Sequence, residues 1–506
     1  MVNQRRWGVL LTYLNIVLSM VIGLVYTPVM LRLLGQSEYG LYSLIGSMVG
    51  YLSVLDMGLG NTLVRYTAKN RADGTPEREA ELNGLFLRIY SFIGMLVLVA
   101  GIVIYSQIEI LFGATLSEGE IQRARIMLVL LIFNLALTFP FSIFASILQA
   151  YEKFIFLRVS NILRVLLNPL LVLPFLYWGY GSVMMVVVST ILNIACLLAN
   201  WYYCWRYLHV KFKSGKFARP FLLEVAGYSF FIFLNAIMDK IYWGTGQFVL
   251  GIVSGTVQVA IYAIAMQFMM MYMNFSTAVS GVLLPKVTMM VASGVNASEL
   301  TKLMIRVGRL QCLIVGYIFV MFLLVGDMFI ELWAGKNYLP AYPIVLLLMG
   351  ALIIPLVQNV GITILQAMNL NRYRMTAYTI CAGIALGVSF PLAVYWDGLG
   401  CAIATASSLV ISTGVIMNRY YARRIHLDIR SFWLNIMELS KGFFLLAVAG
   451  FGLRYGIVWE LSWQNFCLLT VIDTVIYAAI MYGWCMNRDE RGLCCGFVQK
   501  IRGSFS

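Results

Sequence analysis

Long apolar segments separated by short polar turns run along the whole 506-residue chain. A helix needs about 20 mostly apolar residues to cross the hydrocarbon core of a membrane, and about fourteen segments reach that length. The sequence therefore predicts an all-α polytopic membrane protein. The expected spans are residues 8–34, 41–63, 84–108, 125–148, 155–177, 183–205, 221–250, 257–291, 303–325, 342–366, 375–396, 399–421, 432–458 and 461–486. The eighth is long for one crossing and is expected to continue beyond the membrane with Pro285 and Lys286.

Charge is scarce in this sequence and lies mostly in the turns. Only 11% of the residues are charged, against roughly 25% in soluble domains, and 61% are apolar. The net charge of +14 comes from basic residues in short turns, so it indicates membrane topology rather than nucleic-acid binding. These turns alternate with mainly acidic ones. The positive-inside rule then predicts that both termini are cytoplasmic.

Residue types for catalysis or metal binding are few. The two histidines, His209 and His426, lie in basic loops, and the nine cysteines lack metal-type spacing. The sequence has no Gly-x-x-x-x-Gly-Lys-Ser/Thr loop for ATP. We therefore expect no catalytic residue, no metal site and no cofactor, and we expect that the protein is not an enzyme.

Two short patterns recur along the chain with nearly the same offset. Residues 147–150 and 364–367 both read Ile-Leu-Gln-Ala, 217 residues apart, and Tyr-Trp at 177–178 recurs at 395–396, 218 residues apart. Agreement between two offsets indicates an internal duplication, and such repeats predict two lobes around a central cavity. The predicted parts are residues 1–215 with spans 1 to 6, residues 216–430 with spans 7 to 12, and residues 431–506 with two further helices and a basic cytoplasmic tail.

Motifs in both halves carry a family resemblance. Residues 33–44 read Leu-Leu-Gly-Gln-Ser-Glu-Tyr-Gly-Leu-Tyr-Ser-Leu, and residues 51–61 read Tyr-Leu-Ser-Val-Leu-Asp-Met-Gly-Leu-Gly-Asn. Further along, Asp-Lys at 239–240 is followed by Leu-Gly at 250–251, Ala-Ile-Tyr at 260–262 and Leu-Leu-Pro-Lys at 283–286. These segments resemble the polysaccharide flippase family, the Wzx-like exporters of the superfamily that also contains MATE drug exporters and MurJ lipid flippases.

The resemblance implies a fold and a location. It implies two six-helix lobes, a central cavity walled mainly by the first, second, seventh and eighth spans, and two extra C-terminal helices. It also implies a multi-pass protein of the bacterial cytoplasmic (inner) membrane. One departure is residues 242–247, Tyr-Trp-Gly-Thr-Gly-Gln, where the family often has a tighter apolar stretch. Two glycines there are expected to loosen or kink the helix.

Charged residues inside spans are the first candidates for a substrate site, because a charge at the centre of a membrane helix costs about 2.5–3.5 kcal/mol. Lys240 is expected to neutralise a diphosphate or acidic sugar, with Asp239 pairing with it or carrying a proton. An ion pair that only locks the lobes is the alternative. Arg32 is expected to hold the diphosphate near the exit or to anchor outer headgroups. Asp56 and Asn61 either contact the cavity or cap a helix end.

Uncharged polar side chains within the spans form a second group of candidates. Amides bind sugar hydroxyls, but they also join helices through hydrogen bonds worth roughly 0.6 kcal/mol. The amide candidates are Asn15, Asn235, Gln267, Asn274, Gln358 and Asn359. Tyr242 is a candidate for stacking on a sugar ring, with an ordinary interfacial aromatic as the alternative.

These patterns favour a flippase that moves a polyprenyl-diphosphate-linked oligosaccharide from the cytoplasmic to the outer leaflet by alternating access. The alternatives are a MATE-type multidrug or cation antiporter and a lipid II flippase. A membrane-embedded glycan polymerase or ligase is disfavoured because the outer loops are short. Expected partners are the anionic lipid-linked oligosaccharide, membrane lipids, a glycan polymerase or other envelope-assembly proteins, and H+ or Na+ as a coupling ion, without nucleic acid.

Overall fold

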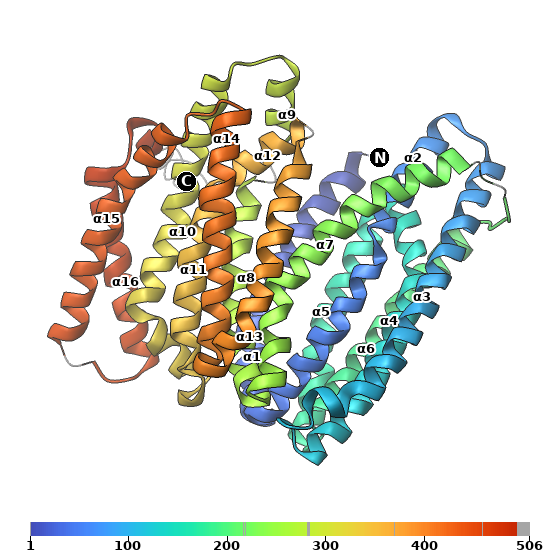
Figure 1. The fold of residues 1–506 in the computed structure, drawn as a ribbon, viewed down its shortest axis with the longest axis horizontal. Helices are drawn as coiled ribbons and strands as arrows, with labels where there is room; N and C mark the ends of the chain where they lie inside the picture. The colour runs from blue at the N-terminus through green and yellow to red at the C-terminus, as the bar shows by residue number, and fades with distance from the viewer. Residues whose placement is uncertain are drawn as a thin grey trace. The chain divides into compact units, whose positions relative to one another are not determined.

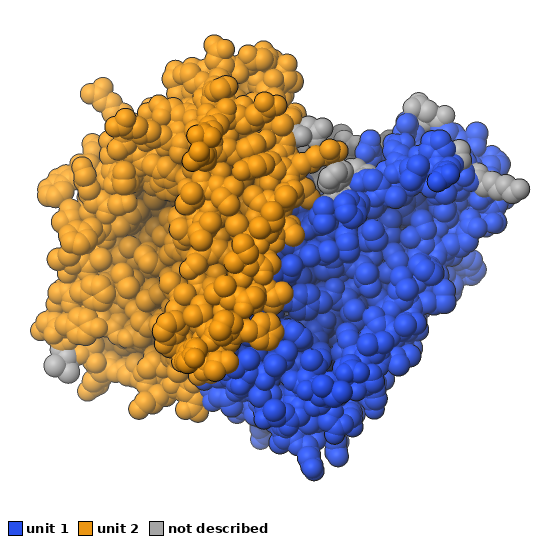
Figure 2. Space-filling model, viewed as in Figure 1, with its two compact units in different colours: residues 1–263 blue, residues 264–506 orange. Residues whose placement is uncertain are grey.

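The computed structural model describes residues 2–215, 217, 219–280, 284–368, 370–457 and 459–492. All regular structure in these ranges is helical, which confirms the predicted all-α class. The chain divides into two compact units, unit 1 (Met1–Ala263) and unit 2 (Ile264–Ser506), shown in Figures 1 and 2. The three-part division at residues 215 and 430 stays a prediction.

Unit 1 is a bundle in which α4 lies between α3 and α6 and packs against both (Figure 1). α7 packs along the second half of α1 and the two short elements that follow it. The helices of unit 1 are α1 (Val2–Leu52), η1 (Ser53–Asp56), α2 (Leu59–Asp73), α3 (Pro76–Phe112), α4 (Glu118–Ala150), α5 (Phe154–Tyr177), α6 (Ser182–Tyr207), α7 (Arg219–Val253) and the first residues of α8 (Thr256–Ser280).

Unit 2 is built around α10, which packs against α11, α15 and α16. An apolar core joins α10 to α15 and α16 through Leu324, Leu446 and Leu469. The remaining helices of unit 2 are α9 (Leu284–Ala292), α10 (Ala297–Trp333), η2 (Lys336–Tyr338), α11 (Ala341–Val357), α12 (Asn359–Ala367), α13 (Asn371–Leu409), η3 (Val410–Met417), α14 (Asn418–Arg424), α15 (Ile429–Gly456), α16 (Trp463–Ile480) and η4 (Met481–Cys485).

Each of the expected apolar spans falls on helix. By length and composition, 11 described helices are able to cross a membrane, or 12 if the bent pair α11 and α12 is one span. Two of these segments, Trp7–Ala72 with 66 residues and Asn371–Arg424 with 54, each contain two expected spans. The count of about fourteen is therefore not confirmed. The eighth expected span becomes α8 followed by α9, and residues 281–283 lie outside the described ranges.

The repeated sequence encodes a repeated helix end. α4 ends at the first Ile-Leu-Gln-Ala copy and α12 at the second. The same N–H to C=O hydrogen bonds close both ends: Tyr151 to Ile147 and Lys153 to Leu148 at 2.9 Å, Met368 to Ile364 at 2.9 Å and Leu370 to Leu365 at 2.8 Å. After the second repeated pattern, Gly179 (φ 86) and Asp397 (φ 47) both take positive φ and interrupt the helix. The duplication is thus visible in backbone geometry.

The expected kink in α7 is absent. The helix runs without interruption through residues 242–247, so that prediction is wrong. The two glycines allow close packing instead: a Cβ on Gly246 would lie 2.4 Å from the Tyr262 ring, and one on Gly244 would lie 3.4 Å from the Tyr51 hydroxyl. Glycine in a helix interior costs only about 0.5–1 kcal/mol relative to alanine, which aromatic packing offsets.

α1 does contain a break, at Gly35. Its backbone (φ 78, ψ 171) lies in a region that is accessible almost only to glycine. The break directly precedes Ser37 and Glu38, so it decides where these two side chains are placed. A glycine is needed at this point of the 33–44 motif because of backbone geometry, since no atom lies within 4 Å of a Cβ built there.

We expect Gly35→Ala to destabilise the protein by about 1–3 kcal/mol through backbone strain alone. The thermal unfolding midpoint of the purified protein measures this. Gly46→Ala is the matched control because Gly46 lies in the same helix, is exposed, and also has no atom within 4 Å of a new Cβ. Equal midpoints for the two variants would show that the break does not require glycine.

Candidate functional site

A polar seam joins α7 to the antiparallel segment formed by the end of α1, η1 and α2. Residue numbers rise along one side of the seam as they fall along the other, and hydroxyl groups supply most of its contacts. The side-chain hydrogen bonds are Tyr66 to Glu224 at 2.8 Å, Thr62 with Ser229 at 3.2 Å and Tyr51 with Thr245 at 2.9 Å. The seam therefore places the charged residues of α7 beside the second motif of the sequence, residues 51–61.

Lys240 lies on this seam, deep in the span. More than a dozen residues separate it from either end of α7, so about 20 Å of helix lies between it and the nearer end. Its Nζ would lie 3.3 Å from a Cβ on Gly50, and the absence of a side chain there gives the ammonium group room. Among the described residues, the half-buried Lys240 has neither a hydrogen bond nor an ion pair.

The other charged candidates of unit 1 have different surroundings. Asp239 is exposed and does not pair with Lys240. Asp56 is half-buried at the end of η1 and accepts a hydrogen bond from the Tyr90 hydroxyl at 3.2 Å. Arg32 is exposed just before the break in α1, without a hydrogen bond or ion pair to any described residue.

The polar uncharged candidates are divided between the units. Asn61 is exposed on α2, and Asn15 and Asn235 are half-buried on α1 and α7. Tyr242 is buried on α7. In unit 2, Gln358 is buried and donates to Asn418 at 2.5 Å, which is the geometry of a helix-joining amide.

The remaining unit 2 candidates also lie on helices. Asn359 donates to the buried Ser276 hydroxyl at 3.5 Å, and Gln311 donates to the same hydroxyl at 3.3 Å. Gln267 is half-buried and Asn274 exposed, both on α8. Substrate contact by any of these side chains stays a prediction.

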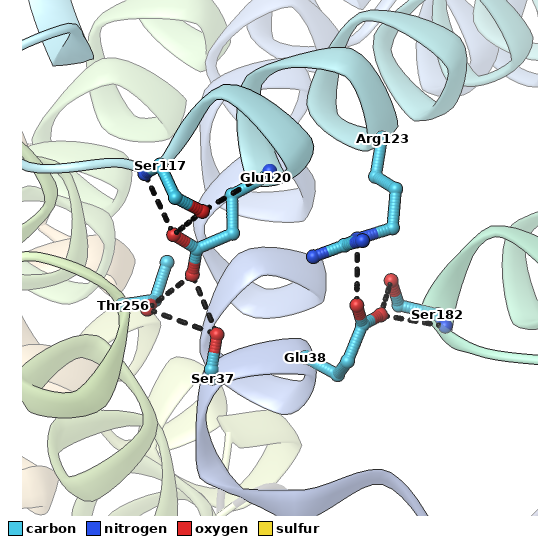
Figure 3. Close-up of polar contacts among 7 residues, drawn as sticks. All are labelled: Ser37, Glu38, Ser117, Glu120, Arg123, Ser182 and Thr256. Carbon is cyan, nitrogen blue, oxygen red and sulfur yellow. Dashed lines mark hydrogen bonds and ion pairs between the residues drawn. The ribbon is translucent and has the colours of Figure 1, made fainter.

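Glu120, treated in the sequence only as an outer-loop acid, is the centre of a polar network in unit 1 (Figure 3). One carboxylate oxygen accepts from the hydroxyls of Ser37 at 2.5 Å and Thr256 at 2.8 Å. The other accepts from the Ser117 hydroxyl at 2.7 Å and its N–H at 2.9 Å. The network thus joins α1, the start of α4 and the start of α8. A Cβ on Gly40 would lie 1.8 Å from the Thr256 carbonyl, so this glycine permits the close approach.

Glu38 forms a second anchor beside the first (Figure 3). One of its oxygens pairs with Arg123 Nε of α4 at 2.6 Å. The other accepts from the Ser182 hydroxyl and, at 3.0 Å, from the Ser182 N–H in the first turn of α6. A carboxylate at a helix N-terminus is stabilised by the helix dipole and by the free N–H groups. The 33–44 motif therefore ties α1 to α4 and α6.

Sequence reasoning missed this network, although one signal was present. Ser117 and Glu120 form a capping box, and a Ser-x-x-Glu pattern before an apolar segment indicates one. That pattern locates the start of α4 but not the partners of Glu120, because Ser37 and Thr256 are far away in sequence.

The model of the polysaccharide biosynthesis protein family matches residues 6–291, more than half of the chain, and the chain belongs to this family. This confirms the resemblance drawn from the two motifs. No curated protein sequence matches the chain at a significant level.

Solved structures with the same fold are transporters. The chain is similar to lipid II flippase MurJ in an inward closed conformation, with TM-score 0.70, 16% identity and coverage of 94% of this chain and 98% of that one. It is also similar to an inward-facing multidrug resistance MATE transporter of the MOP superfamily, with TM-score 0.62, 14% identity and coverage of 81% and 98%. For the Vibrio cholerae MATE transporter VcmN the values are 0.53, 13%, 84% and 98%. Family and fold together support a multi-pass membrane transporter of the flippase type.

We expect Glu120→Gln to destabilise unit 1 by about 3 kcal/mol, since an amide keeps one acceptor oxygen and charge-assisted hydrogen bonds contribute about 1.5–3 kcal/mol each. Thermal unfolding of the purified protein measures the loss. Glu118→Gln, an exposed neighbour in the same helical turn, is the control. A Glu120 variant as stable as the Glu118 variant would mean that the four hydrogen bonds contribute nothing.

Proposed function

We propose that this protein is a flippase that moves a polyprenyl-diphosphate-linked oligosaccharide from the cytoplasmic to the outer leaflet of the bacterial inner membrane. Both termini would be cytoplasmic, and transport would proceed by alternating access. The family and the fold support the general class. The choice of an anionic lipid-linked sugar rests on the residues of unit 1.

The observation that carries this proposal is the unpartnered Lys240. An ammonium group at the middle of a membrane helix is costly unless an anion or water compensates it. No described residue supplies an anion, and Gly50 leaves space beside the Nζ atom. A diphosphate would provide the missing negative charge. A cationic drug would be repelled, which favours the flippase over the cation antiporter.

Polar groups on either side of Lys240 suit the sugar part of such a substrate. Tyr51 and Thr245 lie on one side of it along the seam, and Asp56 with Tyr90 lies on the other. Hydroxyl groups both donate and accept hydrogen bonds, as sugar hydroxyls do. In this proposal Asn61, Asn235 and the other amide candidates add contacts to the glycan, and Arg32 binds the diphosphate near the exit.

We expect Lys240→Ala to lower transport at least about tenfold, because a hydrogen bond to a charged group contributes about 1.5–3 kcal/mol. Lys240→Arg keeps the charge and should retain most of the transport. Lys69→Ala removes an exposed lysine of α2 in the same unit and is the control. The measurement is movement of labelled lipid-linked oligosaccharide across vesicles at equal protein content. Normal transport by Lys240→Ala would overturn the assigned role.

The substrate class is tested in cells and in vesicles. Deletion of the gene should leave lipid-linked oligosaccharide on the cytoplasmic face, and the purified protein should move that lipid across vesicles without ATP. Efflux of cationic dyes should stay at the level of empty vesicles. Dye efflux together with unchanged distribution of the glycolipid would favour the antiporter instead.

A further inference from the structure

A basic pocket lies in unit 2, where the start of α10 meets the segment that follows η4. Its volume is about 470 Å³, and four basic and two acidic side chains line it. They are Lys302, Arg306, Arg309, Arg488, Asp489 and Glu490. The pocket lies outside the seam of unit 1, and neither the motifs nor the proposed transport uses it.

The pocket lies at the boundary between lipid and water. α10 carries no charged residue from Leu310 to Gly326, so Arg309 marks the edge of its apolar stretch. The α16–η4 span ends at Cys485, immediately before the pocket residues of the C-terminal segment. Trp484, with 81% of its surface exposed, and the exposed Tyr482 lie next to the pocket, where aromatic side chains mark the interface.

Arg309 forms a fixed floor of the pocket. It is 1% exposed and binds both carboxylate oxygens of Glu490, at 2.7 and 3.1 Å, as well as Glu438 at 3.2 Å. Burial raises the pKa of Glu490, but hydrogen bonds from Arg309 and the Asn487 backbone lower it more, so this pKa lies below its ordinary value. Glu490 is therefore ionised at neutral pH, and Arg309 is neutralised from within the protein.

The excess positive charge is carried by the other basic residues. Lys302 pairs with Glu299 at 2.8 Å in an exposed ion pair, which contributes little. Arg306 and Arg488 are exposed and have no ion pair or hydrogen bond with any described residue. Asp489 is the acid that opposes them. Two guanidinium groups over a rigid floor match the geometry of a phosphate, which arginine binds through paired N–H donors.

We propose that this pocket binds the phosphate of an anionic phospholipid, with Arg306 and Arg488 as its ligands. The interfacial level of the pocket selects a membrane lipid, because the headgroup phosphates lie at that depth and the acyl chains extend along the apolar surface of α10 and α16. This lipid would be a resident of the bilayer rather than the transported substrate.

The test is native mass spectrometry of the full chain in detergent, titrated with phosphatidylglycerol or phosphatidylcholine. Arg306→Gln with Arg488→Gln should weaken phosphatidylglycerol binding about 25-fold, since each basic residue near an anionic lipid surface contributes a factor of about five. Asp489→Asn should strengthen binding about fivefold by the same reasoning. Phosphatidylcholine should bind more weakly and respond little to either change.

The control is Arg423→Gln with Arg424→Gln, which removes two exposed arginines of α14 that do not line the pocket. It should leave phosphatidylglycerol binding unchanged. An equal loss in the control would mean that only the net charge matters and would overturn the site. Equal affinity of the unaltered protein for both lipids would overturn it as well. All variants change exposed side chains, and an unchanged unfolding midpoint verifies the fold.

Discussion

The carboxylates of Glu38 and Glu120 hold one end of unit 1 together, and the arrangement of its other helices depends on them. A carboxylate withdrawn from water is stable only where donors replace the lost hydration. For Glu120 these donors come from α1, the start of α4 and the start of α8, and for Glu38 from Arg123 and the first turn of α6. The break at Gly35 directs the two side chains to these partners. The glycines and acids of one short motif therefore act together, and none of them has its full effect alone.

The seam between α7 and the α1–η1–α2 segment has a different character. Three of its helix-to-helix contacts are single hydroxyl hydrogen bonds, two of them between neutral groups, and a neutral bond of this kind contributes about 0.5–1.5 kcal/mol. A sugar hydroxyl offers nearly the same bond, so exchange of partners costs little. Lys240 thus lies where the protein's own contacts are easiest to replace. Strong anchoring at one end and replaceable contacts along the seam are what a transport protein needs to bind a polar headgroup and release it.

Much of the fold was predictable because hydrophobicity and repetition are local signals. Each apolar segment became helix, and both copies of Ile-Leu-Gln-Ala became the same helix end. Lys240 was predictable as a candidate because a charge in an apolar segment is visible without a structure. The partners of Glu120 were not, because Ser37 and Thr256 lie 83 and 136 residues away and a single sequence carries no record of which distant residues meet. The kink predicted at residues 242–247 failed for a related reason: packing against the rings of Tyr51 and Tyr262 overrides the local tendency of glycine.

Arg309 has a consequence for biosynthesis. Its five hydrogen bonds reach Glu490, Glu438 and two backbone carbonyls, and Glu490 follows it in the sequence by 181 residues. At ribosomal rates of about 5–20 residues per second, α10 is complete for about 10–40 s before its main counter-ion is made. During this interval the arginine must stay hydrated or paired with lipid phosphate at the membrane surface. The last helices of the chain therefore complete a unit that has been waiting for them, and a ribosome that stops early leaves a buried cation without its anion.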